Sequence, residues 1–161
     1  MGLDACVYCN CFEPGKLRCP PPKNISLRVA PNGALDFDSS RLTMEERQEW
    51  DRWEHSFACE HKGGMLLQHR LGNISSIAII RELLNTRKAD FRLLLEQAVY
   101  NGTHGGDYIS ADKIPTLAKE ISLITGMKCH SKDEAKFLDL FREQMHELTQ
   151  VALAHSKPIA F

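Results

Sequence analysis

A long amphipathic stripe near the end of the chain is the strongest constraint on what it can fold into. Between Leu138 and Ala152 apolar residues recur at alternating spacings of three and four, which is the period of one helix face. Ser131 followed by Glu134 forms a capping box that begins this segment. Phe137, Leu140 and Val151 widen the stripe. We therefore predict a long C-terminal helix that packs against two other elements.

Capping chemistry predicts another helix over 43–58. Thr43 and Glu46 have the spacing of a capping box, in which each side chain bonds the other residue's free amide. The apolar stripe of this helix consists of Trp50, Trp53 and Phe57. Such a stripe is typical of a face that packs into a core.

The region 73–156 is predicted to be mainly helical. Asn73 can cap a helix whose apolar residues again follow the helical period. A further helical pattern runs over 90–101, and another over 114–126. Asn101-Gly102 and Gly126 end these two patterns, because glycine tolerates the left-handed conformation of a helix C-cap.

The N-terminal region carries strand patterns instead. Leu3, Ala5 and Val7 alternate with more polar residues, which is typical of a strand with one buried face. Alternation over 25–38, interrupted by the turn residues Pro31-Asn32-Gly33, predicts a β-hairpin that pairs with this first strand. A short strand is expected at about 65–71.

Strands followed by helices indicate an α+β fold rather than a βαβ repeat. We expect a small antiparallel N-terminal sheet packed by about four to five helices, of which the C-terminal one is long. The 161 residues should form a single domain over 1–161, strand-rich over 1–38 and mainly helical over 43–58 and 73–156. A chain of this length can bury a sizeable core without disulfides.

Composition narrows the classes of partner. The chain has 20 Lys and Arg against 21 Asp and Glu, a formal net charge of −1. Such a balance gives no field that would attract nucleic acid, so no nucleic-acid partner is expected. No apolar run approaches the roughly 18 residues of a membrane span, so no membrane partner is expected. The start of the chain does not have the pattern of a secretory signal, which makes the cytoplasm the expected compartment, with thiols rather than disulfides.

Two short segments of the chain contain four side chains that can bind a metal ion. Cys9 and Cys11 form a C-x-C pair, and Cys59 and His61 lie near the predicted end of the helix over 43–58. Thiolate and imidazole are the ligands of tetrahedral zinc sites, so these four residues make a candidate set for one structural zinc ion. If Cys9 and Cys11 lie on a strand, both face the same side and can chelate.

Two other interpretations of the cysteines stay open. They can be small buried apolar side chains that bind nothing, in which case the protein has no cofactor. Alternatively, Cys9, Cys11, Cys59 and His61 form the centre of a metal- or thiol-dependent enzyme of the hydrolase type. No nucleophile signature surrounds any cysteine, so we assign no catalytic residue.

An acidic segment stands out in this nearly neutral chain. Seven of the 21 acidic residues lie between positions 36 and 54: Asp36, Asp38, Glu45, Glu46, Glu49, Asp51 and Glu54. An acidic surface can steer a basic protein partner toward it. These residues are therefore the candidate partner-binding surface.

Several short motifs carry a resemblance. Met1-Gly2-Leu3-Asp4-Ala5, Cys9-Asn10-Cys11, Pro20-Pro21-Pro22 and Cys59-Glu60-His61 resemble a group of small uncharacterised bacterial cytoplasmic proteins. In size and loose organisation the chain is also similar to immunity proteins, which bind and neutralise a cognate toxin. That similarity implies a noncatalytic protein-binding module of the immunity or antitoxin type, whose partner is a basic toxin domain. The metal- or thiol-dependent enzyme is the alternative.

Overall fold

The computed structural model describes residues 2–13, 16–22, 27–38, 40, 42–56, 58–101 and 106–161. Its centre is a four-stranded antiparallel sheet in the order β4-β1-β6-β5. The strands are β1 (Gly2–Tyr8), β4 (Met65–Asn73), β5 (Tyr108–Ile109) and β6 (Ile159–Ala160). Together with the helices below, this confirms the predicted α+β fold and its antiparallel sheet.

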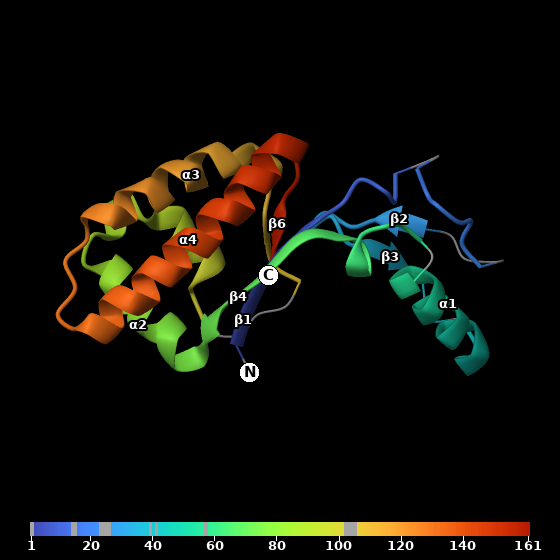
Figure 1. Ribbon diagram of the computed structural model, residues 1–161, viewed down its shortest axis with the longest axis horizontal. Coiled ribbons are helices and arrows are strands. Elements are labelled where there is room, and N and C mark those ends of the chain that lie inside the picture. Colours follow the sequence, from blue (N-terminus) through green and yellow to red (C-terminus); the bar gives the residue numbers. More distant parts are fainter. Residues whose placement is uncertain are drawn as a thin grey trace.

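Three α-helices gather on one side of this sheet (Figure 1). They are α2 (Ile74–Asn85), α3 (Ile114–Leu123) and α4 (Lys132–His155). Asn73 caps α2 by accepting a hydrogen bond from the Ser76 amide, and Ser131 caps α4 by accepting one from the Glu134 amide. The long C-terminal helix and both caps agree with the sequence prediction. The Glu134 carboxylate, however, accepts from the amide of His130 rather than from that of Ser131.

The main core lies between this sheet face and the helices. Leu3, Ala5 and Val7 of β1 point into it and are at most 2% exposed, as their alternation predicted. The apolar stripe of α4 belongs to the same core. Its residues Leu138, Phe141, Met145, Leu148 and Ala152 are all buried. We call this body, which contains the four-stranded sheet and α2 to α4, the main lobe.

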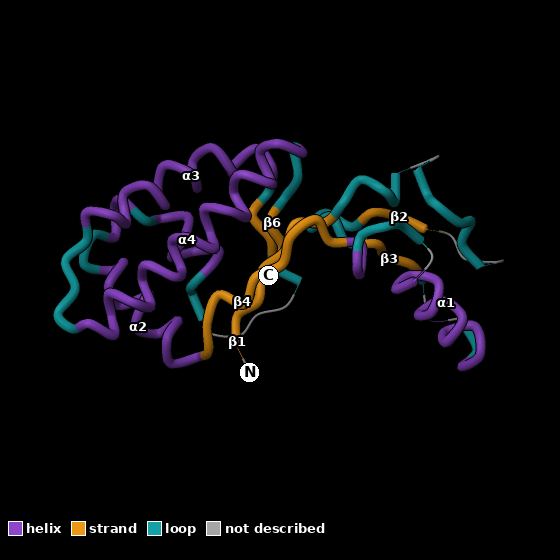
Figure 2. Tube along the Cα trace, in the orientation of Figure 1, coloured by secondary structure: helices purple, strands orange, loops and turns teal. Residues whose placement is uncertain are grey.

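A minor lobe lies at the other end of the molecule (Figure 2). It contains α1 (Met44–Ser56) and a separate two-stranded sheet of β2 (Leu27–Val29) and β3 (Leu35–Phe37). Thr43 and Glu46 form the predicted capping box at the start of α1. Trp50 and Trp53 are buried as expected, whereas Phe57 lies outside the described residues.

The predicted pairing of the hairpin with the first strand was wrong. β2 pairs with β3 alone, while β1 pairs with β4 along its length and with β6 at Cys6. The hairpin stays in the minor lobe because its apolar side chains pack there, with the Phe37 ring 4.0 Å from that of Trp50 between centroids. Residues 25 and 26 of the predicted hairpin lie outside the described residues.

The two lobes meet along the ribbon that β1 and β4 form. Leu66 of β4 packs against both cores. Lys157, beside β6, reaches across to Glu13, with 3.5 Å between ammonium and carboxylate. The single domain over 1–161 stays a prediction, since these contacts join two distinct cores.

The helical segment predicted over 90–101 takes an unusual form. Residues Leu94–Ala98 form a π-helix, in which the Val99 amide bonds the Leu94 carbonyl at 2.8 Å. The buried Glu120 of α3 caps this segment, because its carboxylate accepts hydrogen bonds from the amides of Leu93 and Leu94, both at 2.8 Å. The end predicted at Asn101-Gly102 cannot be compared, since residues 102–105 lie outside the described residues.

Replacing Glu120 with alanine should destabilise the main lobe by about 3 kcal/mol, because it leaves two amide donors without an acceptor in a buried position. Urea unfolding followed by circular dichroism measures this change. The exposed Lys119→Ala on the same helix is the matched control and should change the free energy of unfolding by less than about 0.5 kcal/mol. Equal effects of the two substitutions would show that the Glu120 cap contributes nothing.

Candidate metal centre

The first pair of candidate ligands lies in a turn that follows β1. The strand ends at Tyr8, and the Cys9 amide bonds the Gly64 carbonyl at 2.8 Å. The chain then reverses, since the Glu13 amide bonds the Asn10 carbonyl at 3.1 Å. Cys9 and Cys11 are therefore brought together by a turn and not, as expected, by sharing one face of a strand.

The second pair follows α1. The Ala58 amide bonds the Trp53 carbonyl at 2.8 Å, which ends the helical region and directs Cys59 back toward the first turn. His61 precedes a short 3-10 turn over Lys62–Gly64, and its carbonyl accepts from the Gly64 amide at 3.0 Å. This turn leads directly into β4.

Glycine is required at position 64. Its φ of 68° lies in the left-handed region, and a Cβ there would stand 2.5 Å from the Phe12 ring. The turn can therefore approach the first segment only because Gly64 has no side chain. This close approach brings the segment with Cys59 and His61 next to the segment with Cys9 and Cys11. We call these two segments the two arms of the centre.

The four candidate ligands converge. Their ligand atoms, three Sγ and one imidazole nitrogen, all lie within 4.8 Å of one another. The Sγ atoms of Cys9 and Cys59 are 3.9 Å apart, and Cys11 Sγ is 3.3 Å from His61 Nδ1. Tetrahedral zinc with ordinary bond lengths needs S to S separations of about 3.8 Å and S to N separations of about 3.5 Å. The predicted group Cys9, Cys11, Cys59 and His61 can thus hold a metal ion.

The backbone around the sulfurs also suits a metal–thiolate group. The Cys11 amide donates to Cys9 Sγ at 3.4 Å, which would stabilise negative charge on that sulfur. Cys59 Sγ donates as a thiol to the His61 carbonyl at 3.3 Å. A metal would replace that thiol proton, so this contact belongs to the metal-free form.

An apolar wall encloses one side of the group. Cys9 and Cys59 are 2% and 8% exposed and belong to a cluster with Phe12, Trp50 and Trp53. Cys11 and His61 are half-buried and lie nearer the solvent. The group therefore forms part of the minor core, with one edge toward water.

Burial controls the protonation of these thiols. It raises the pKa of Cys9 to about 12, and it also raises the pKa of Cys11. Without a cation, both side chains are neutral thiols at neutral pH. A nucleophilic cysteine needs a lowered pKa, so the environment of these two does not favour a thiol nucleophile.

The other three cysteines lie outside the group. Cys6 is on the face of β1 that points away from the helices, Cys19 packs at the edge of the minor core, and Cys129 packs against the main core. This agrees with the expectation that they do not join the other four. All six cysteines are free thiols.

Several acidic residues of the candidate partner surface form bonds within the minor lobe. Asp36 pairs with Arg28 at 2.6 Å, and Asp38 accepts hydrogen bonds from Ser40. Glu46 bonds the Thr43 amide in the capping box. These carboxylates therefore stabilise the minor lobe locally. The bond of Glu46 was predicted from the capping box, whereas the partners of Asp36 and Asp38 were not.

The rest of the acidic segment lies on α1. Glu54 accepts from Trp50 Nε1 at 3.1 Å, and its burial raises the pKa of the carboxyl group. Glu45, Glu49 and Asp51 are exposed and, among the described residues, their carboxylates make no ion pair. The outward acidic surface thus reduces to these three residues of α1.

Sequence reasoning missed two residues that shape the centre. Phe12 forms part of its wall, and Gly64 allows the two arms to meet. The pair Gly63-Gly64 indicated only a turn, because a sequence does not show which ring lies against a glycine. A glycine pair that begins four residues after Cys59 was nevertheless the available signal.

Metal uptake should depend on pH, because Cys9 and Cys11 must each lose a proton to bind a cation. Both pKa values are raised, so the thiols stay protonated from pH 6 to 8, and the apparent affinity should fall at least about a hundredfold per unit as pH falls. Chelator competition at several pH values measures this. An affinity that does not change with pH would contradict the assignment of thiol ligands.

Comparisons with protein-family models, with curated proteins and with solved structures found no match to the chain. Within the described ranges, no helix combines the length and the apolar character that crossing a membrane requires. What can be concluded about function therefore rests on the chemistry of the residues themselves.

Proposed function

We propose that the chain is a noncatalytic protein-binding module whose minor lobe is folded around one structural zinc ion. The observation that carries this proposal is the convergence of Cys9, Cys11, Cys59 and His61 within a small apolar lobe. The acidic helix α1 is built directly on that lobe and would present the binding surface.

The donor set favours zinc over other cations. Three sulfurs and one imidazole nitrogen are soft or borderline ligands, whereas calcium and magnesium prefer oxygen. Separations of 3.9 Å and 3.3 Å between donor atoms match the edges of a zinc tetrahedron. Zinc also carries no redox chemistry of its own, which suits a centre that only holds chain segments together.

The number of protein ligands favours a structural role. Structural zinc sites have four protein ligands, while catalytic ones have three and keep a position for water or substrate. All four residues here lie close enough to bind one ion. The metal-dependent hydrolase therefore takes second place, and a general hydrolase screen of the zinc-loaded protein distinguishes the two.

The apolar core of the minor lobe is so small that a metal crosslink would be needed to stabilise it. Only six of its described apolar side chains are buried: Cys9, Phe12, Trp50, Trp53, Ala58 and Cys59. Very small cores rarely stabilise themselves, and natural examples add disulfides or metals. Two of the six are candidate ligands, so the metal and the core would form together.

The partner that fits this surface is a basic protein domain. Glu45, Glu49 and Asp51 are exposed on α1, which lies at the far end of the molecule from α2, α3 and α4 in Figure 1. An immunity or antitoxin role, in which the acidic helix occludes a basic toxin domain, is the form of this proposal that the acidic surface supports. The free thiols suit the reducing cytoplasm, where we place this activity.

Protein purified without chelator should contain about one zinc per chain, measured by elemental analysis. Cys9→Ser combined with His61→Ala should remove the metal, while Cys6→Ser combined with Cys129→Ser should retain it. Trp50 and Trp53 line the same core, so zinc removal should also change tryptophan fluorescence. Finding no metal in the unaltered protein would overturn the proposal of a structural zinc.

Reversing the charge of the acidic helix should abolish partner binding. Co-expression with the products of neighbouring genes, scored by co-purification and by rescue of growth, identifies the partner. Glu45→Lys, Glu49→Lys and Asp51→Lys together should weaken that complex at least about a hundredfold, since complementary charge sets association. The matched control reverses Asp4, Glu82 and Asp133, which are exposed in the main lobe and, among the described residues, make no ion pair. Equal weakening by both triple variants would exclude α1 as the binding surface.

A further inference from the structure

Cys9 and Cys59 hold their sulfurs side by side across the two arms of the metal centre. Their Sγ atoms are 3.9 Å apart, although the two residues are 50 positions apart in the chain. A disulfide bond places two sulfurs about 2 Å apart, so these two would have to approach by about 2 Å. Cys11 Sγ lies instead against His61 Nδ1, at 3.3 Å. The geometry therefore pairs Cys9 with Cys59.

The surroundings of these two sulfurs confine them to each other. Cys9 and Cys59 are 2% and 8% exposed and belong to the apolar core of the minor lobe. Such buried sulfurs cannot reach a cysteine of another molecule. A bond formed by one of them therefore ends within the centre.

A small solute can reach Cys59 through a hollow in the surface of the minor lobe. This hollow has a volume of about 500 Å³ and is lined by Cys11, Lys16, Arg18, Cys59 and Glu60. Its charged side chains carry both signs, which suits a small neutral solute. Cys9 is not part of the lining, so Cys59 is the member of the pair that a solute meets first.

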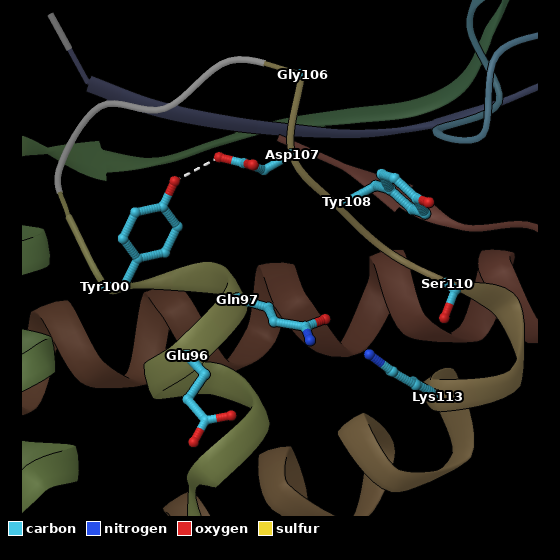
Figure 3. Close-up of a pocket in the computed structure, with 8 residues that line it drawn as sticks. All are labelled: Glu96, Gln97, Tyr100, Gly106, Asp107, Tyr108, Ser110 and Lys113. Atoms are coloured by element: carbon cyan, nitrogen blue, oxygen red, sulfur yellow. Dashed lines mark hydrogen bonds between the residues drawn. The ribbon is translucent and has the colours of Figure 1, made fainter.

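The hollow of the main lobe, shown in Figure 3, differs in its chemistry. Its described lining residues lie between Glu96 and Lys113 and include no cysteine. Of these two hollows, the one in the minor lobe is thus the one that admits solutes to sulfur.

Zinc would also put the two sulfurs into their reactive form. A cysteine that binds a metal ion is a thiolate, and the thiolate rather than the thiol attacks an oxidant. The Cys11 amide, 3.4 Å from Cys9 Sγ, favours negative charge on that sulfur as well. This step rests on the structural zinc proposed above.

We propose that Cys9 and Cys59 are a modification site for hydrogen peroxide, which joins them in a disulfide and so releases the zinc ion. The Cys59 thiolate attacks the peroxide, an S–O bond forms, the O–O bond breaks, and hydroxide leaves. The Cys9 thiolate then attacks the Cys59 sulfur, an S–S bond forms, the S–O bond breaks, and a second hydroxide leaves. Two thiolates thereby give two electrons to one peroxide.

Oxidation would exchange one crosslink of the minor lobe for another. Cys11 and His61 alone remain as ligands, whereas a structural zinc site needs four. The ion therefore leaves. The disulfide joins the same two arms, so α1 keeps its support in the oxidised chain, and a dithiol reductant together with zinc restores the first state.

Treatment of the full, zinc-loaded chain with hydrogen peroxide tests this proposal. We expect about one zinc ion to be released per disulfide formed, as measured with a colorimetric chelator. The chain should lose two of its six free thiols, and mass spectrometry of peptides should find Cys9 joined to Cys59. Dithiothreitol and added zinc should reverse both changes.

The outcomes separate this proposal from that of the structural zinc. A zinc-containing chain that releases no zinc with peroxide, or that joins a different pair of cysteines, would overturn the modification site and leave the structural zinc intact. A chain that contains no zinc and still joins Cys9 to Cys59 would overturn the structural zinc alone. A chain with neither zinc nor this disulfide would overturn both.

Cys9→Ser and Cys11→Ser form a matched pair of variants, because each removes one of the four ligands. Cys11→Ser keeps both members of the redox pair, so prolonged peroxide treatment should still join Cys9 to Cys59. Cys9→Ser leaves Cys59 without its partner and should yield at least about tenfold less disulfide. Circular dichroism verifies that both variants are folded.

The control lies outside the centre. Cys6→Ser combined with Cys129→Ser should release zinc and form the disulfide as the unaltered chain does. Equal yields of disulfide from Cys9→Ser and Cys11→Ser would show that Cys9 is not the partner of Cys59.

Discussion

The pairing of β1 with β4 is the interaction on which both halves of the molecule depend. In the main lobe this ribbon supplies Leu3, Ala5, Val7 and Leu71 to the core beneath the helices. At the other end of the ribbon, the segment that follows β1 carries Cys9 and Cys11, and the segment that precedes β4 carries Cys59 and His61. The Cys9 amide donates to the Gly64 carbonyl there. The register of the pair shifts between Leu3 and Asp4 and again between Val7 and Tyr8. Such irregularities bend and twist a strand pair. The candidate ligands thus meet because a long-range strand pair aligns segments that are distant in sequence.

Local chemistry made much of the fold predictable. The box at Thr43, the caps at Asn73 and Ser131 and the stripe of α4 need only neighbouring residues, and the structure confirms them. Pairing between distant strands was not predictable in this way. The hairpin alternates as cleanly as β1 does, yet its partner depends on where Leu27, Leu35 and Phe37 find apolar neighbours.

At the candidate site, too, some features could be predicted from the sequence and others could not. Ligand chemistry alone selected Cys9, Cys11, Cys59 and His61, and the structure brings these four together. The reason given for chelation by Cys9 and Cys11 was wrong, since a turn rather than a strand places them. The capping box indicated a partner for Glu46, but the sequence did not indicate that Asp36 pairs with Arg28 or that Glu54 accepts from Trp50, so it could not show which acidic residues face outward.

The separation of the two ligand arms along the chain has a mechanical consequence. Cys9 and Cys59 are 50 residues apart, so an ion held between them closes a loop that includes the hairpin and α1. In the chain-entropy model, closing a loop of that size removes about 4 kcal/mol of conformational entropy from the unfolded state. The main core lies outside this loop. Loss of the ion would therefore remove this constraint from the minor lobe alone, and with it support for the acidic helix, while the sheet and its three helices keep their own core.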